Sequence, residues 1–322
     1  MNYLAPWWLP DGHSQTIWPA LFSRRVRDGK LPFKRERWSS PDADFVDVDR
    51  LSATHADAPL LVLFHGLEGS SQSHYSQAFG CVARSKGWAF AVPHFRGCSG
   101  ELNLAPRAYH SGDHEEIGWL LARFRAEHQG PIFAVGVSLG GNALLRWAGE
   151  AQNQAARLVS AVTAISSPLD LTISGHAIGK GFNRHVYTRM FLRSMLPKAT
   201  SKWEQYPGLF DLQRLRAARD LYEFDDIFTA PLHGFANTKD YWSRASAKPV
   251  LASIRVPALA VNALNDPFVP AVGLPTIGEV GSCVTLWQPA QGGHVGFAGA
   301  PFPGHVFVLP QAVCEWLCLH IC

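Results

Sequence analysis

The sequence predicts an α/β fold, in which a mainly parallel central sheet is flanked by helices. Six short, continuous apolar runs are typical of strands that are covered on both faces. Amphipathic segments with helical spacing fall between these runs, and this alternation implies right-handed crossovers and parallel neighbours. One long helical stretch interrupts the alternation and predicts an insertion.

The predicted parallel strands occupy residues 60–65, 88–95, 132–137, 159–166, 256–263 and 283–289. The sequences KRERW and DFVDVDR precede the first of them and predict an antiparallel hairpin. Helices are predicted at residues 76–86, 115–128, 139–150 and 306–320. Asp113 stands before the second of these helices, where we expect it to cap the N-terminus.

The alternation stops between about Leu171 and Lys248, where no convincing strand pattern occurs. We expect this segment to form a helical insertion that acts as a lid over the C-terminal edge of the sheet. The chain then divides into an N-terminal arm with the first part of the core (1–170), the insertion (171–248) and the second part of the core (249–322). Aromatic residues of the insertion are candidates for an apolar acyl pocket or for packing within it: Trp203, Tyr206, Phe210, Tyr222, Phe224 and Phe228.

The composition excludes several classes of protein. The net charge is only +3, and no basic block gives a reason to expect a nucleic-acid partner. The N-terminus lacks the features of a secretory signal, and no run approaches the roughly 18 apolar residues of a transmembrane segment. We therefore expect a cytoplasmic protein.

The six cysteines lack metal-ligand spacing, so we expect reduced thiols and no metal. The oligomeric state leaves no signal in the sequence.

The sequence GVSLGG (136–141) places Ser138 between a predicted strand and a predicted helix. This context gives the G-x-S-x-G pattern its meaning as a nucleophile turn. A tight strand-to-helix turn strains the backbone of the serine, and side chains at Gly136 and Gly140 would clash there. The turn holds the hydroxyl at the end of the sheet. We therefore expect Ser138 to be the nucleophile of an α/β-hydrolase.

A serine hydroxyl needs a base to take its proton and an acid to orient that base. In α/β-hydrolases the acid and then the histidine follow the nucleophile along the chain. Asp266 and His294 each come just after a predicted strand, so they emerge at the same sheet edge as Ser138. We expect these three residues to form the catalytic triad.

Other residues compete for the roles of acid and base. Asp170 follows the strand after the nucleophile and is an alternative acid. His305, in a loop after PFPG, and His320, in the predicted terminal helix, are alternative bases. Neither histidine directly follows a predicted strand, which favours His294.

The oxyanion of an acyl-transfer intermediate needs two hydrogen-bond donors. The N–H of Leu139, at the start of a helix, is one candidate. The second donor should come from the loop HGLEGS (65–70), where the N–H of Leu67 is the first candidate and that of Glu68 the second. His65 in the same loop either contacts substrate or holds the loop through hydrogen bonds.

Six motifs together resemble the YheT-like α/β-hydrolases, which are bacterial proteins related to plant and animal abhydrolase-domain esterases and lipases. The motifs are GHSQT (12–16), HGLEGS (65–70), HFRGCSG (94–100), GVSLGGN (136–142), NDPF (265–268) and GGHVGF (292–297). The resemblance extends from about Pro6 to the C-terminus, and it places the charge-relay residues of the family on Ser138, Asp266 and His294. In the segment GHSQT, His13 and Gln15 either have a structural role or line the pocket. Cys98 has no base arranged beside it, so we do not expect it to be a nucleophile.

The resemblance implies hydrolysis of carboxylic esters, which in animal members include acylglycerol and phospholipid esters. We expect a small-molecule or lipid ester as substrate and no cofactor. A thioesterase, an amidase, an acyltransferase and a small-ligand-binding protein on the same fold are the alternatives.

Overall fold

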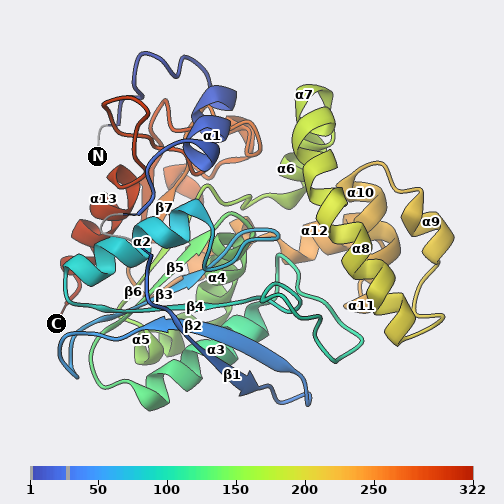
Figure 1. The fold of residues 1–322 in the computed structure, drawn as a ribbon, viewed down its shortest axis with the longest axis horizontal. Coiled ribbons are helices and arrows are strands. Elements are labelled where there is room, and N and C mark those ends of the chain that lie inside the picture. The colour runs from blue at the N-terminus through green and yellow to red at the C-terminus, as the bar shows by residue number, and fades with distance from the viewer. Residues whose placement is uncertain (1–2, 27–29, 322) are drawn as a thin grey trace.

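The computed structural model describes residues 3–26 and 30–321. Its centre is an eight-stranded sheet with the strand order β1-β2-β4-β3-β5-β6-β7-β8 (Figure 1). The strands are β1 (Lys34–Ser39), β2 (Phe45–Leu51), β3 (Leu60–Phe64), β4 (Ala89–Pro93), β5 (Ile132–Val137), β6 (Ala161–Ile165), β7 (Ala258–Val261) and β8 (Val284–Trp287). The first two residues of the predicted N-terminal arm, and Cys322, lie outside the described residues.

The pairing of the strands confirms the predicted mainly parallel sheet. Strands β1 and β2 form the expected antiparallel hairpin, and β2 is also antiparallel to β4. All pairs from β4 through β3 to β8 are parallel. Because parallel strands end at one edge of the sheet, the segments that follow β3, β5, β7 and β8 meet there.

Helices cover both faces of this sheet (Figure 1). The flanking helices are α2 (His74–Ser85), α3 (His114–Glu127), α4 (Leu139–Ala151), α5 (Ala155–Leu158) and α13 (Val308–Cys318). Strand β3 shows how the two faces are filled, since Leu61 and Leu63 pack with residues of α2 and α13. Val62 and Phe64 point the other way and pack with residues of α3 and α4. Successive side chains of a strand point to opposite faces of the sheet. A continuous apolar run therefore packs against the helices on both faces.

Asp113 differs from the prediction in one respect. It stands at the N-cap position of α3, but its side chain makes no capping hydrogen bond. Its carboxylate instead accepts from Arg107 Nη2 at 2.5 Å. In this bond both partners are charged, so the carboxylate pairs with the guanidinium instead of capping the helix.

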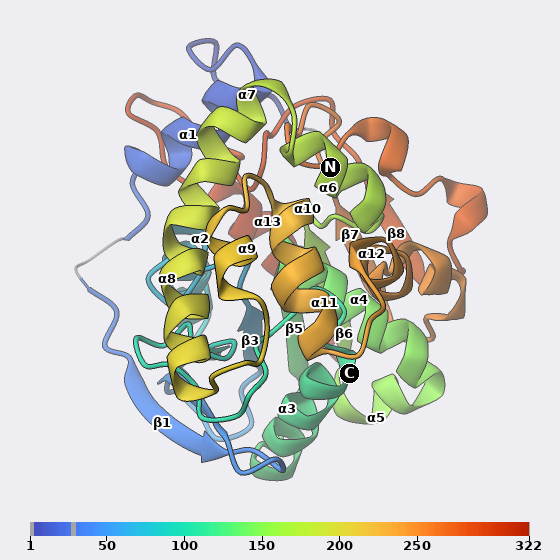
Figure 2. The same cartoon turned by 90° about the vertical axis from the view of Figure 1, so that its right-hand side faces the viewer.

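Between β6 and β7 the chain forms only helices and connecting loops within the described segment 166–257. The α-helices are α6 (Leu171–Ile178), α7 (Gly181–Asn183), α8 (Arg189–Gln205), α9 (Leu212–Arg216), α10 (Leu221–Phe224), α11 (Ala230–Leu232) and α12 (Thr238–Ala245). Two π-helical turns, at Arg184–Thr188 and Asp225–Thr229, join neighbouring helices of this set. The group extends from one end of the sheet in Figure 1 and lies in front of the sheet in Figure 2.

The N-terminal segment contributes α1 (Gly12–Leu21), which begins with a capping box between Asp11 and Ser14. No helix among the described residues combines the length and the apolar character needed to cross a membrane.

Candidate active site

Ser138 occupies the sharp turn between β5 and α4. Its backbone has φ 52° and ψ −119°, a conformation that costs energy for a residue with a side chain. The turn is held in place because the Ser138 N–H donates to the carbonyl oxygen of Ile165, at the end of β6, at 2.8 Å. The hydroxyl is thereby fixed at the C-terminal edge of the sheet.

The glycines around Ser138 are required by close backbone contacts. A Cβ atom on Gly136 would lie 2.5 Å from the carbonyl oxygen of Gly140. A Cβ atom on Gly140 would lie 2.5 Å from the carbonyl oxygens of both Phe64 and His65. These contacts are with backbone rather than with flexible side chains, so a side chain at either position would force the backbone of the turn to move.

The structure brings Ser138, His294 and Asp266 into one hydrogen-bonded chain. His294 Nε2 lies 3.1 Å from Ser138 Oγ, and His294 Nδ1 lies 2.9 Å from Asp266 Oδ2. With the ring proton on Nδ1, the imidazole donates to the carboxylate and its Nε2 accepts from the serine hydroxyl. The Asp266 side chain is fully buried, whereas that of His294 keeps 10% of its surface exposed. This geometry allows the imidazole to take a proton from the hydroxyl.

Local contacts hold the acid and the base. The second carboxylate oxygen of Asp266 accepts from the N–H groups of Phe268 and Val269, at 2.8 and 3.2 Å. The Phe268 ring stacks on the imidazole of His294, with centroids 4.2 Å apart. The carboxylate is thus fixed by its own turn, and the imidazole is fixed by the turn that follows Asp266.

The alternative acid and bases lie elsewhere. Asp170 caps α6, because its carboxylate accepts from the N–H of Ile173 at 3.0 Å. His305 exchanges backbone hydrogen bonds with Gly299 in the loop before α13. His320, just beyond the end of α13, packs edge-to-face against Trp316. None of the three appears among the described residues that line the cavity beside Ser138.

Two backbone N–H groups are available for an oxyanion. Leu139 is the first residue of α4, so its N–H has no partner within the helix. Among the described residues, the N–H of Leu67 has no hydrogen-bond partner either. The N–H of Glu68, the second candidate, is occupied because it donates to the hydroxyl of Tyr109 at 2.9 Å. This arrangement favours Leu67 over Glu68 as the second donor.

His65 is buried within the loop and does not line the cavity. Its Nδ1 donates to the carbonyl oxygen of Gly66 at 2.7 Å, and its Nε2 accepts from the N–H of Phe95 at 3.0 Å. Burial lowers the pKa of His65 to about 3, so the ring is neutral. These contacts fit a histidine that holds the loop, and they leave neither ring nitrogen for substrate.

His13 also lies outside the lining of the cavity. Its Nδ1 lies 3.1 Å from the hydroxyl of Tyr187, and its ring contacts Phe182 with centroids 4.5 Å apart. His13 therefore joins the N-terminal segment to the insertion, which favours its structural role.

The cavity beside Ser138 is enclosed by the core on one side and by the insertion on the other. Leu67, Leu139 and His294 line the cavity together with Ser138. The insertion contributes mainly apolar side chains, namely Leu171, Ile178, Phe191, Met195, Leu221, Phe224, Phe228 and Trp242. Of the aromatic residues that the sequence proposed for a pocket, Phe224 and Phe228 line it. Trp203, Tyr206, Phe210 and Tyr222 do not line it.

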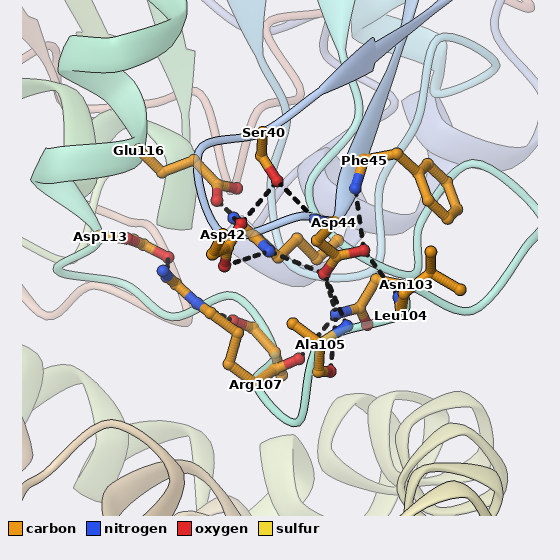
Figure 3. Close-up of polar contacts among 12 residues, drawn as sticks. Ser40, Asp42, Asp44, Phe45, Asn103, Leu104, Ala105, Arg107, Asp113 and Glu116 are labelled. Atoms are coloured by element: carbon orange, nitrogen blue, oxygen red, sulfur yellow. Dashed lines mark hydrogen bonds and ion pairs between the residues drawn. The ribbon is translucent and has the colours of Figure 1, made fainter.

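A network of buried charges supports the polar end of the cavity (Figure 3). Arg96, which lines the cavity, donates to Asp44 at 2.7 Å and to Glu116 at 2.6 Å. Asp44 also accepts from the side chain of Asn103 and from two backbone N–H groups of the same loop. Asp44 lies between β1 and β2, Arg96 follows β4, and Glu116 is on α3. The network therefore joins the hairpin, the loop after β4 and a flanking helix.

Residues of α8 reach the same end of the cavity, and the sequence analysis did not identify them. Lys198 pairs at 2.8 Å with Glu68, the residue that follows Leu67 in the chain. Lys202 is buried and donates to the carbonyl oxygens of Asn103 and Ala105. No local pattern marks these lysines, because their partners lie about a hundred residues away in the chain. Together they join the insertion to the core.

Cys98 is close to this cluster but differs from a catalytic thiol. Burial raises its pKa to about 12, although the nearby Lys198 acts in the opposite direction. The thiol is therefore protonated, and a protonated thiol is a poor nucleophile. This agrees with the expectation that Cys98 is not the nucleophile. The other cysteines among the described residues, Cys81, Cys283, Cys314 and Cys318, are also free thiols.

Comparison with known proteins places these features in a family. The family model described as alpha/beta hydrolase fold matches residues 59–301. The chain belongs to the α/β-hydrolase fold family. It is 37% identical over 314 residues to "Putative esterase YheT" of Escherichia coli (strain K12), a match that covers 96% of this chain and 91% of that protein. The resemblance to the YheT-like α/β-hydrolases is thereby confirmed.

More distant members of the α/β-hydrolase fold family are also similar. The chain is 24% identical to "Phospholipase ABHD3" of Homo sapiens over 94% of its length and 75% of that protein. Among solved structures, Est1E from Butyrivibrio proteoclasticus with bound ferulic acid matches with a TM-score of 0.56 and 14% identity, over 89% of this chain and 99% of that one. At this identity the structural similarity concerns the fold alone.

Proposed function

We propose that this protein is a serine hydrolase that cleaves carboxylic esters through an acyl-enzyme on Ser138. The observation that carries the proposal is the position of His294, within hydrogen-bond distance of both Ser138 and Asp266. The names of its relatives, an esterase and a phospholipase, support ester hydrolysis as the reaction class.

The reaction has two steps. His294 takes the proton of Ser138 as the hydroxyl attacks the ester carbonyl, and Asp266 stabilises the imidazolium. The N–H groups of Leu67 and Leu139 bind the oxyanion, and each such donor contributes about 3 kcal/mol to the stability of the transition state. His294 then protonates the leaving alcohol. Water repeats the sequence on the acyl-enzyme and restores the serine.

The apolar cavity supports a substrate with a hydrophobic acyl group, either a small-molecule ester or an acylglycerol-type lipid. Segment 171–248 supplies most of the apolar wall, so we propose that it is the lid of the active site. The arm with the first part of the core, 1–170, and the second part of the core, 249–322, then carry the catalytic side chains. The lid determines which acyl groups fit.

The test is the variant Ser138→Ala, assayed against a series of p-nitrophenyl esters. The proposal requires that hydrolysis falls to the uncatalysed rate while the circular dichroism spectrum is unchanged, because Ser138 supplies the hydroxyl that lies within hydrogen-bond distance of His294 Nε2. Ser201→Ala, at an exposed serine of α8, is the matched control and keeps full activity. Full activity of Ser138→Ala would reject the nucleophile assignment. If a fluorophosphonate probe fails to label Ser138 in the unmodified protein, a ligand-binding role replaces the enzymatic one.

A further inference from the structure

Helix α1 lies directly against the two loops that carry Asp266 and His294, and it is close to the segment before α13 in both views (Figures 1 and 2). A Cβ atom on Gly12 would lie 2.0 Å from the carbonyl oxygen of Asn265. A Cβ atom on Gly296 would lie 1.8 Å from the carbonyl oxygen of Gln15. The backbone of α1 is therefore in direct contact with the backbone of both loops. Only glycine at positions 12 and 296 allows this close approach.

The side chain of Gln15 joins the two loops. It is buried, and its Oε1 accepts from Asn265 Nδ2 at 2.9 Å and from the N–H of Gly292 at 2.8 Å. Asn265 Oδ1 in turn accepts from the N–H of Gly293 at 3.0 Å. Asn265 directly precedes Asp266, and the two glycines directly precede His294. One amide group thus connects the loop of the acid to the loop of the base.

Thr16 makes the next contact of the same helix. Its Oγ donates to the carbonyl oxygen of Gly12 at 2.6 Å and accepts from the N–H of His294 at 2.9 Å. The backbone of the proposed catalytic base is therefore anchored on α1.

The loop before His294 needs such anchors. Gly292 and Gly293 have φ values of 151° and 59°, which residues with side chains rarely adopt. Glycines leave a backbone with many accessible conformations, so contacts from outside the loop must select one of them. Hydrogen bonds from α1 act on Gly292 and His294, and Asn265, which is itself bound to Gln15, accepts from Gly293 between them.

We propose that Gln15 and Thr16 are positioning residues for ester hydrolysis, which set the imidazole of His294 against Asp266 and Ser138. The proposal rests on the proposed function of the triad. A displacement of about 1 Å at a reacting group can lower a rate by about a hundredfold. The two side chains touch neither the cavity nor the reacting atoms, so they act through the loops alone.

The experiment measures kcat, KM and thermal unfolding for four variants of the full chain with a p-nitrophenyl ester. Gln15→Leu removes the acceptor that joins the two loops, and Thr16→Val removes the acceptor for the His294 N–H. Thr16→Ser keeps that oxygen and is the conservative rescue. Gln311→Leu, at an exposed glutamine of α13, is the matched control.

We expect kcat to fall about a hundredfold in Gln15→Leu and Thr16→Val, while KM stays within about threefold, because the cavity is unchanged. Thr16→Ser and Gln311→Leu should keep the kcat of the unmodified protein. The rate of fluorophosphonate labelling of Ser138 should fall in parallel with kcat, since labelling also needs the imidazole in place.

The inference is wrong if Gln15→Leu and Thr16→Val keep their kcat, if the loss lies in KM, or if Thr16→Ser falls as far as Thr16→Val. If Gln15→Leu does not fold, the comparison of Thr16→Val with Thr16→Ser decides alone. Ser138→Ala in the same assay separates the two proposals. Activity that survives in Ser138→Ala rejects the proposed function, whereas activity that depends on Ser138 but not on Gln15 or Thr16 rejects only this inference.

Discussion

At the scale of single residues, the site depends on how little space surrounds Ser138. The strained serine is tolerated because the neighbouring backbone fixes it, with the carbonyl oxygen of Ile165 on one side and the start of α4 on the other. At Gly140, α4 lies so close to the end of β3 that the carbonyl oxygens of Phe64 and His65 are both 2.5 Å from where its Cβ would be. The conformation of Ser138 therefore depends directly on the packing of the backbone around it.

We therefore expect Gly140→Ala to destabilise the protein by about 1–3 kcal/mol, which is the usual cost of an overpacked core. The added methyl meets two carbonyl oxygens that cannot rotate away, and this cost exceeds the gain in helix propensity. Urea unfolding measures the change. Gly278→Ala is the control, because no atom lies within 4 Å of its added Cβ. Equal unfolding midpoints for the two variants would contradict the steric argument.

At the scale of elements, the helical insertion is joined to the core by polar contacts as well as by apolar packing. Lys198 and Lys202 of α8 reach the loops of Glu68 and Asn103. Inside the insertion, Asp225 lies in a π-helical turn and lines the cavity. Burial raises its pKa to about 6, although hydrogen bonds from Thr229 and Trp242 favour the ionised form.

The raised pKa of Asp225 makes the stability of the protein depend on pH. The folded state holds the proton more tightly than the unfolded state, so this carboxyl lowers stability as the pH rises from about 4 to 6. We expect Asp225→Asn to be more stable than the unmodified protein by about 1–3 kcal/mol above pH 6 and equally stable below pH 4.

Thermal unfolding across this pH range, compared between the two proteins, measures the effect of Asp225. Asp57→Asn, at an exposed carboxyl, provides the control. A stability difference between Asp225→Asn and the unmodified protein that does not change with pH would refute the assignment.

At the scale of the whole molecule, the charge network around Arg96 joins parts of the chain that the sheet alone does not fix. Burial alone would raise the pKa of Asp44, but hydrogen bonds from Asn103 and three backbone N–H groups outweigh it and lower the pKa to about 2. The ionised carboxylate therefore stabilises the fold above pH 4, and this contribution is lost as the pH falls from about 4 to 2.

Asp44→Asn should reduce the free energy of unfolding at pH 7 by about 2–3 kcal/mol and flatten its decline between pH 4 and pH 2. Urea unfolding at neutral and acidic pH gives both quantities. Asp42→Asn is the comparison. Asp42 contacts the same guanidinium but keeps 39% of its side chain exposed. We therefore expect Asp42→Asn to reduce the free energy of unfolding by less than Asp44→Asn does. A larger effect at Asp42 than at Asp44 would show that burial does not control the strength of this network.

Much of the fold and of the site follows from local patterns. The run at 132–137 predicted β5 with its observed bounds, because burial on both faces leaves a continuous apolar run. The antiparallel hairpin and the mainly parallel character of the sheet were also predicted. Asp266 and His294 were selected because each follows a strand, and parallel strands deliver such residues to one edge. Asp113 was expected to cap α3, and the prediction failed because Arg107 competes for its carboxylate.

The sequence by itself determined the alternation of strands and helices and the glycine-flanked turn around Ser138, since periodicity and local steric limits act over a few residues. Only the tertiary structure decided which side chains support that turn and its partners. Gln15 lies 277 positions from Gly292, and Lys198 of the insertion contacts Glu68 in the loop that follows β3. Such contacts leave no local pattern, because a hydrogen bond depends on distance in space and not on separation along the chain.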